Sequence, residues 1–496
     1  MGRTFLFAGA AAAALSGCTV GPDYAPPRNI APPTYGEPQP AAGAEVDPAH
    51  WWTVFGDAEL TSLIERALAG NPTIEIAASR VRQARLQEIE ARGIGRPQID
   101  ATANATNLRF SKNAGFSSLA RLFGSNQNGD DSEPDTPSGG VAAPGGSITT
   151  FAAGFDANWE LDLFGRGART REAAAAAGDA LVWTGRDAEV TLAAEVANAY
   201  FAYRLDQTQI AVLRDEIARQ ERAQGITANR ARAGLVPEVE VVRQRAALTA
   251  TEARLLPLEA DARAQVHALG TLLGQGPEAV SAELSQPLPA LGDVPAIPAG
   301  LPSDLLRRRP DIRAAERRIA AATAQVGVAT ADLYPRFSLT GIAQLISTSL
   351  ASLFEPDGLQ TTASAGAMFP ILDWGRRKAV IGEREEDRTQ AYLQYQQTVL
   401  GALKEVEDAL ALIDRERQRR EVLVRALADA ERSASAIEAQ YRTGFVAQDV
   451  LLNAQVQALS AREDLADSEA KLRQQTAALF KALGGGWSED EPAPGA

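Results

Sequence analysis

The chain has little of what enzymes use for chemistry. Its 496 residues include one cysteine, Cys18, and two isolated histidines, His50 and His267. A lone cysteine forms no disulfide within the chain, and these few residues form no cluster of zinc-binding type. The sequence also lacks a glycine-rich phosphate loop and a nucleophile elbow. We therefore expect no catalytic residue, no metal site and no cofactor, and expect that the protein is not an enzyme.

Basic residues are also too few for a nucleic-acid partner. There are 49 Lys and Arg against 63 Asp and Glu, which gives a formal net charge of −14. Because a phosphate backbone requires a basic stripe, this balance argues against binding to nucleic acid. The one basic cluster, Arg307 to Arg309, stands before Pro310. Charge patterning predicts that it is a solvated helix flank.

Long apolar runs are missing beyond the N-terminus. Residues 1–17 resemble a lipoprotein signal peptide, with Arg3 before the apolar run Phe5 to Leu15. The run ends in Leu-Ser-Gly before Cys18, as in a bacterial lipobox, so we expect Cys18 to be lipidated. A plain secretory signal with an unrelated cysteine is the alternative. Thr19, in the place of an aspartate, favours the outer membrane by resemblance to lipoprotein sorting. No later stretch reaches the ~18 apolar residues of a membrane helix, so only strands could span a bilayer.

An internal duplication organises the chain beyond a Pro-, Ala- and Gly-rich tether at 18–50. Residues 72–97 match 310–335 at an offset of 238, and from residue 165 onward the offset is 210. The first copy therefore has 28 extra residues, which we place within 112–147. Matched positions include Pro72/Pro310, Arg80/Arg318, Pro97/Pro335, Gly165/Gly375, Glu195/Glu405, Arg232/Arg442 and Gly234/Gly444.

Each copy predicts a helix, two strands, a very long helix and a returning helix. Proline is absent from 145–236 and from 371–491, which indicates two long helical regions. The expected domains are repeat 1 at 51–274, an equatorial linker at 275–302, repeat 2 at 303–484 and a disordered tail at 485–496. We expect strands at about 98–110, 149–162, 336–348 and 361–372, and long helices at 166–233, 237–273, 376–443 and 447–483. Pro257 is expected to kink the second of these helices.

The strand before residue 163 alternates between apolar and polar residues. Its polar positions are Asp156, Asn158, Glu160 and Asp162. An edge strand of a soluble sandwich would alternate in the same way. Four strands per chain cannot close a membrane barrel, however, so several chains would have to share one. Three chains give twelve strands and a conducting interior, in which these polar residues would face the lumen.

Several motifs resemble one family. They are Cys18 to Tyr24 (CTVGPDY), Trp51 to Leu60 (WWTVFGDAEL), Trp159 to Arg166 (WELDLFGR) and Leu301 to Ile312 (LPSDLLRRRPDI). They resemble the TolC-like outer-membrane efflux channels, in particular the NodT-type, OprM-like lipoproteins of resistance-nodulation-division (RND) efflux systems, over residues 18–487.

This resemblance implies an α+β membrane protein. It would be a trimeric 12-stranded outer-membrane β-barrel continued by a periplasmic α-helical barrel, with a small equatorial domain. The implied function is the exit duct of a tripartite pump, which passively conducts small molecules. The implied partners are two further copies of the chain, a periplasmic adaptor (membrane fusion protein), an inner-membrane RND transporter and outer-membrane lipid. A type I secretion duct and a lipid-anchored periplasmic coiled-coil scaffold are the alternatives.

The resemblance also implies two further sites. The adaptor-contact tips would be the helix turns with Arg232, Gly234, Leu235 and Val236, and with Arg442, Gly444, Phe445 and Val446; an ordinary helical turn is the alternative. The periplasmic gate would follow the second tip, at Asp449, Leu452 and Asn453. Asn453 stands where many relatives have Asp, so Asp449 is the candidate for the acidic group. A solvated helix face is the alternative reading of the gate.

Overall fold

The computed structural model describes residues 19–38, 46–109, 147–286, 291–294, 297, 300, 302–488, 490 and 495. Cys18 and the expected signal peptide lie outside the described residues, as does most of the segment expected to hold the extra 28. The described chain forms two compact units. The first contains 19–23, 89–109, 147–172 and 324–384, and the second contains the other described residues.

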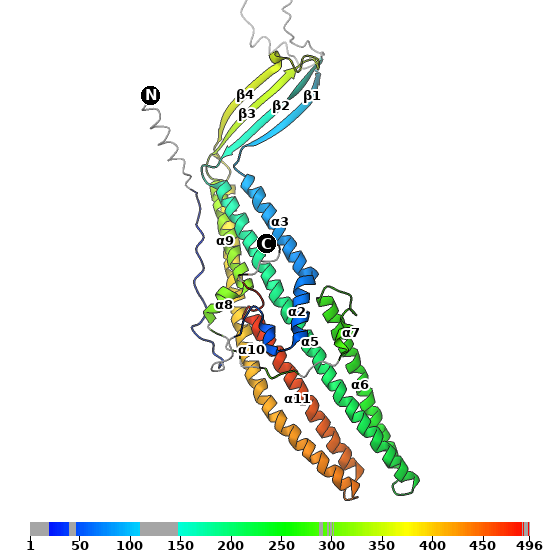
Figure 1. Ribbon diagram of the computed structural model, residues 1–496. Coiled ribbons are helices and arrows are strands. Elements are labelled where there is room, and N and C mark those ends of the chain that lie inside the picture. The colour runs from blue at the N-terminus through cyan, green and yellow to red at the C-terminus, as the bar shows by residue number, and fades with distance from the viewer. Residues whose placement is uncertain are drawn as a thin grey trace, which may run out of the picture. The chain divides into compact units, whose positions relative to one another are not determined.

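The first unit contains one antiparallel sheet in the order β1-β2-β3-β4 (Figure 1). Its strands are β1 Gln98–Arg109, β2 Ser147–Leu161, β3 Arg336–Ser347 and β4 Leu359–Met368. The register is continuous along each pair, with Ala157 opposite Ile99 on one side and Gly341 on the other. Since β1 and β4 each have one neighbour within the described chain, both leave a row of backbone groups unpaired at the sheet edge.

The helices repeat in length between the two halves of the chain. α3 Pro72–Gly93 and α9 Pro310–Ala331 have 22 residues each, α5 Arg166–Arg232 and α10 Arg376–Arg442 have 67, and α6 Glu238–Leu272 and α11 Gln448–Ala482 have 35. A 67-residue helix is about 100 Å long at 1.5 Å per residue. α6 continues through Pro257 without a break. Shorter elements are η1 Trp51–Phe55, α2 Ala58–Gly70, α7 Ser281–Leu284, α8 Pro302–Arg308 and η2 Pro356–Gly358.

Two apolar clusters hold the second unit together. One centres on Trp51, Trp52 and Phe55, which pack with α2, α5, α6 and the C-terminal end of α11. Trp51 stacks on Phe480 with ring centroids 5.2 Å apart. The other joins Tyr35 of the tether to α9, α10 and α11. Each fully buried large side chain contributes about 1.5–3 kcal/mol to stability, so these clusters determine how the helices pack.

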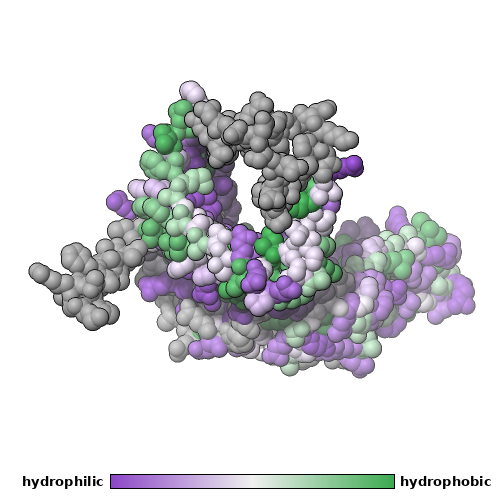
Figure 2. Space-filling view, turned by 90° about the horizontal axis from the view of Figure 1, so that it is seen from above, coloured by the Kyte–Doolittle hydropathy of each residue, from purple (hydrophilic) through white to green (hydrophobic). Residues whose placement is uncertain are grey.

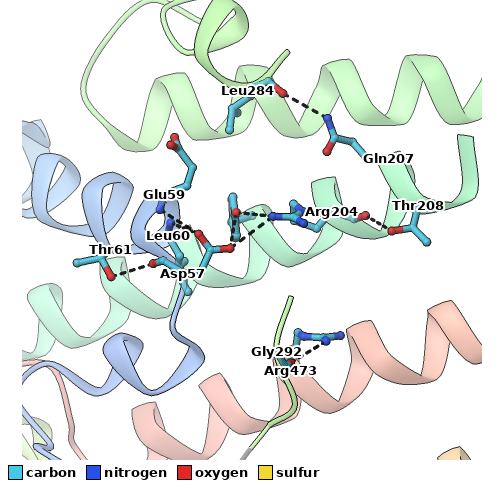
Figure 3. A network of polar contacts seen from close by, with 11 residues as sticks. Asp57, Glu59, Leu60, Thr61, Arg204, Gln207, Thr208, Leu284, Gly292 and Arg473 are labelled. Atoms are coloured by element: carbon cyan, nitrogen blue, oxygen red, sulfur yellow. Dashed lines mark hydrogen bonds and ion pairs between the residues drawn. The ribbon is translucent and has the colours of Figure 1, made fainter. Parts of the chain in front are cut away.

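A buried polar network lies beside the first cluster (Figure 3). Asp57 caps α2 by accepting hydrogen bonds from the backbone N–H groups of Glu59 and Leu60. Its second carboxylate oxygen accepts a 2.7 Å hydrogen bond from the hydroxyl of Tyr200 and lies 3.4 Å from Arg204 on α5. Burial raises the pKa of Tyr200 well above its usual value, and the hydrogen bond to Asp57 adds to this effect. The phenol therefore stays a donor, and the α2 start is tied to α5.

The structure corrects three expectations. Arg309 is not part of a solvated flank: it is buried, because it donates to Asp311, Glu405 and a helix-end carbonyl. The tail is ordered at its start, since Gly486 donates to the Pro48 carbonyl and residues 485–488 pack on the unit. The fourth strand, expected at 361–372, is β4 at Leu359–Met368, because Pro370 lacks the N–H that a ladder needs.

Candidate functional site

The sheet has one apolar face and one mostly polar face. Directly paired residues of antiparallel strands point to the same side, so the register assigns every position to a face. The apolar face has Ile99, Ala101, Ala103, Ala105, Phe151, Ala153, Phe155, Ala157, Trp159, Leu161, Phe337, Leu339, Ala343, Leu345, Leu359, Ala363, Ala365 and Ala367. The same face also has the polar residues Asn107, Arg109, Ser147, Thr149, Ser347 and Thr361. The polar face has Gln98, Asp100, Thr102, Asn104, Thr106, Thr150, Asp156, Asn158, Glu160, Arg336, Ser338, Thr340, Gln344, Gln360, Thr362 and Ser364. The same face also has the apolar residues Leu108, Ile148, Ala152, Ile342, Ile346 and Met368.

No layer of this chain covers the apolar face over the described residues. Ile99 is 70% exposed and Phe155 is 62% exposed. Figure 2, a view from above, shows that exposed hydrophobic residues (green) lie next to one another in patches and that hydrophilic residues (purple) lie beside these patches. The apolar positions of β2 run from Phe151 to Leu161, or about 33 Å of strand at 3.3 Å per residue. If the strand is tilted, this length matches the apolar band, about 25 Å tall, that strands in outer membranes present to lipid.

Three of the four predicted lumen residues lie together on the polar face. Asp156, Asn158 and Glu160 alternate along β2, and Asp156 lies opposite Asp100 of β1. Asp162 differs, because β2 ends at Leu161. Its carboxylate accepts a 2.9 Å hydrogen bond from the backbone N–H of Ala168, so it caps the first turn of α5.

Both predicted tips have the same backbone geometry. After α5, Gly234 has a φ of 73° and donates to the Ala231 carbonyl, while Leu235 donates to the Arg230 carbonyl. After α10, Gly444 has a φ of 82°, and it and Phe445 donate to the carbonyls three and five residues earlier. This is the Schellman ending, which needs a residue in the left-handed region, and glycine is the residue that adopts it without strain.

The tips differ from an ordinary Schellman turn in one respect. The residue after the glycine usually packs back on the helix. Here Leu235 is 70% exposed and Phe445 is 84% exposed. Arg232 and Arg442 are exposed as well, whereas Val236 and Val446 are half-buried. Each tip thus presents one exposed apolar and one exposed basic side chain, and within the described chain the arginines bond only to a neighbour on their own helix, Arg232 to Asn229 and Arg442 to Glu438.

The predicted gate residues lie on the first turns of α11. Asp449 and Asn453 are exposed and Leu452 is half-buried. Asp449 and Asn453 share a helix face because they are four residues apart. The opposite face, with Leu451, is buried. Next to Asp449, the buried Gln448 donates a 2.8 Å hydrogen bond to Gln244 of α6, which joins the two helical hairpins near their tips.

Two features are absent from the described residues. No helix in the described part of the chain is both long and apolar enough to cross a bilayer. Among the same residues, no three His, Cys, Asp or Glu side chains gather as metal ligands would.

The sequence matches the family described as outer membrane efflux protein over residues 63–275 and 301–485. It is 28% identical to the nodulation protein T of Rhizobium leguminosarum bv. viciae, over 96% of this chain and 92% of the relative. It is 29% identical to the toluene efflux pump outer membrane protein TtgC of Pseudomonas putida, over 99% of this chain and 97% of the relative.

Solved structures agree with these relatives. The outer-membrane channel OprN superimposes with a TM-score of 0.81 and 32% identity, over 95% of this chain and 100% of OprN. The fold is therefore that of the TolC-like channels, and the chain belongs to the outer membrane efflux protein family.

Proposed function

We propose that three copies of this chain form a lipid-anchored exit duct in the outer membrane, which passively conducts small molecules delivered by an RND-type pump. The four-stranded sheets would join edge to edge as a twelve-stranded barrel, and the long helices would continue it as a periplasmic tube. Cys18 would carry the lipid anchor.

The observation that carries this proposal is the sheet itself. An apolar face without cover suits lipid, and a polar face suits a wet lumen. The unpaired edges of β1 and β4 require partners, because an open strand edge is not tolerated in hydrocarbon. Joining β4 of one copy to β1 of the next keeps the alternation of strand direction and closes the ring.

The tips and the gate have separate roles in the proposal. The exposed Leu235 and Phe445 would dock a periplasmic adaptor, with the neighbouring arginines adding charge complementarity. Asp449 and Asn453 would line the periplasmic constriction, where Asp449 supplies the charge that attracts cations.

The test is conductance of the purified protein in planar bilayers, with its oligomeric state measured in parallel. We expect discrete openings from a trimer. A lipid-anchored protein that never inserts would contradict the duct and favour the coiled-coil scaffold. Energised cells that lack this chain should also retain pump substrates, and the wild-type gene should restore their export.

A further inference from the structure

The duplication creates two corresponding junctions, of which one lies within the chain. There, the end of β2 and the start of α5 meet the end of α9 and the start of β3. Phe164 stacks on Tyr334 with ring centroids 4.7 Å apart and an interplanar angle of 23°. Arg166 pairs with Asp332 at 3.1 Å. We call this the internal junction.

The tether runs through the internal junction. Val20 donates a 3.3 Å hydrogen bond to the Phe164 carbonyl, and the buried Arg169 pairs with Asp23 at 2.6 Å. A Cβ on Gly165 would lie 2.7 Å from Thr19, and one on Gly21 would lie 2.5 Å from the Cα of Gly327. The tether thus passes in direct contact with the backbone, and Gly165, Gly21 and Gly327 leave no space to spare for a side chain.

The turn between β2 and α5 has a counterpart in the second repeat, which lies between β4 and α10 and is exposed. Trp374 corresponds to Phe164 at the offset of 210, and it is 91% exposed with a φ of 56°. Gly375 corresponds to Gly165, and a Cβ there would meet nothing within 4 Å. Nearby, Ile371 is 88% exposed. A large aromatic residue that is held in the left-handed region and is almost fully exposed indicates a surface that lacks its partner.

The turn between α9 and β3 also has a counterpart, which lies between α3 and β1 in the first repeat and is exposed as well. At the offset of 238, Tyr334 corresponds to Arg96, Asp332 to Ile94 and Gly327 to Ile89. Arg96 is exposed, Ile94 is 38% exposed and Ile89 is 61% exposed. The first repeat therefore has Ile89 in the place of Gly327, which contacts the tether. It has Ile94 in the place of Asp332, which pairs with Arg166.

We propose that these two uncovered turns meet between neighbouring copies, so that Trp374 of one chain stacks on Arg96 of the next and Ile89 fills the place that the tether fills inside the chain. The inference rests on the proposed trimer and names its contact residues. A guanidinium over an indole is a favourable pair, as is a phenyl ring over a phenol. The partner is a second copy because β4 and β1 are the free edges that lead directly into these turns.

The residues that differ between the two junctions make the junction between copies more apolar than the internal junction. The internal junction is fixed by covalent continuity and can use a polar tether and an ion pair, Arg166 with Asp332. The junction between copies has no such continuity, and two isoleucines and a tryptophan bury more apolar surface there. Arg376 and Ala379 take the places of Arg166 and Arg169. The buried arginine that holds the tether therefore has no counterpart at the second turn, where no described residue lies within 4 Å of a Cβ on Gly375.

Cross-linking of paired cysteines tests the contact. The Arg96→Cys/Trp374→Cys protein is treated in outer membranes with a short bis-maleimide and run on a denaturing gel. We expect a ladder of linked dimers and trimers. Phe164→Cys/Tyr334→Cys should instead link within one chain and stay at monomer size, and Arg96→Cys/Phe164→Cys should give no ladder. The single variants exclude links through Cys18.

The outcomes separate this inference from the proposed function. Native trimers without a ladder would overturn the contact and leave the duct intact, whereas a parent protein that forms no trimer would contradict the duct itself. Should the double-cysteine protein fail to assemble, Trp374→Phe and Trp374→Ser decide. Phenylalanine should keep the parent's heat resistance of the trimer and serine should lower it. Equal dissociation temperatures for both variants would overturn the contact.

Discussion

Arg309 donates a 2.9 Å hydrogen bond from Nη1 to the carbonyl oxygen of Ala482, the last residue of α11. In the other copy, Asn71 donates a 2.7 Å hydrogen bond from Nδ2 to the carbonyl of Leu272, the last residue of α6. The two donors are 238 residues apart and the two acceptors 210 apart, as the duplication requires. The last carbonyls of a helix lack partners within it, so two different residues satisfy the same need at matched places.

These caps predict unequal losses of stability. Arg309→Met removes the cap and leaves Asp311 and Glu405 without their ion-pair partner. We therefore expect the free energy of unfolding to fall by roughly 2–3 kcal/mol. This is less than for a fully buried pair, because the two carboxylates are partly exposed. Asn71→Ala removes the hydrogen bond to Leu272 and the one that Oδ1 accepts from the backbone N–H of Thr73, and should cost about 1–2 kcal/mol. Thermal melting in detergent measures both, with Arg308→Met, an exposed neighbour, as the control. Equal melting temperatures for all three variants would contradict the caps.

The sequence predicted the parts of the fold that depend on local pattern and on the duplication. Long proline-free stretches predicted α5, α10 and α11, and the duplication with its matched glycines predicted α6, because a helix end such as Gly234 is determined by its own neighbours. The strands follow from alternation, and the shared fold class is now shown by the family. The tip and gate residues have the expected helix positions, while their roles stay predictions.

Contacts between distant residues were not predictable in this way. Nothing near Asp57 in the sequence indicates that Tyr200, 143 residues later, donates to it. The sequence placed Asp57 only within the motif from Trp51 to Leu60. Arg309 was misjudged for the same reason. Its neighbours Arg307 and Arg308 are exposed, and the burial of the third arginine depends on α10 and α11.

Two adjacent residues of β2 test the faces of the sheet. Ala157 lies on the apolar face and Asn158 on the polar face. Ala157→Lys should destabilise the inserted protein by about 2–4 kcal/mol, because the charge would enter hydrocarbon. Asn158→Lys should assemble normally and reduce cation preference. Heat-resistant trimers in outer-membrane fractions give the comparison. Equal assembly of both variants would mean that the apolar face does not contact lipid.

The exposed side chains at the tips predict a loss of partner binding without a loss of stability. Leu235→Ser and Phe445→Ser remove 70% and 84% exposed side chains, so their effect on unfolding should stay within about 0.5 kcal/mol. Adaptor cross-linking should fall at least tenfold if these residues anchor the contact. Val422→Ser, on the exposed side of α10, is the matched control. Replacing Gly234 and Gly444 by valine should also abolish cross-linking, because the left-handed backbone would be lost; unchanged cross-linking would contradict the tip assignment.

The gate assignment predicts a change in ion selectivity. Asp449→Ala should lower the cation preference of single channels, and Asn453→Asp should raise it, since both residues lie on one exposed face of α11. Asp464, exposed further along the same helix, provides the control Asp464→Ala. The measurement is the reversal potential in a salt gradient. An Asp449→Ala channel with the parent's reversal potential would place the charge elsewhere.

One half-buried acid predicts how stability depends on pH. Burial raises the pKa of Asp206 on α5 to about 6, and the charge of Asp261 adds to the shift. The unfolded value is about 3.9, so the folded protein holds this proton more tightly. The ionised carboxylate therefore costs stability above pH 6, and the cost disappears as the pH falls from 6 through 3.9. Asp206→Asn should raise the melting temperature at pH 8 and have little effect at pH 4. Glu221→Gln, exposed on the same helix, should show no such difference. An Asp206→Asn gain of equal size at both pH values would show that the added stability comes from packing of the amide and not from the proton.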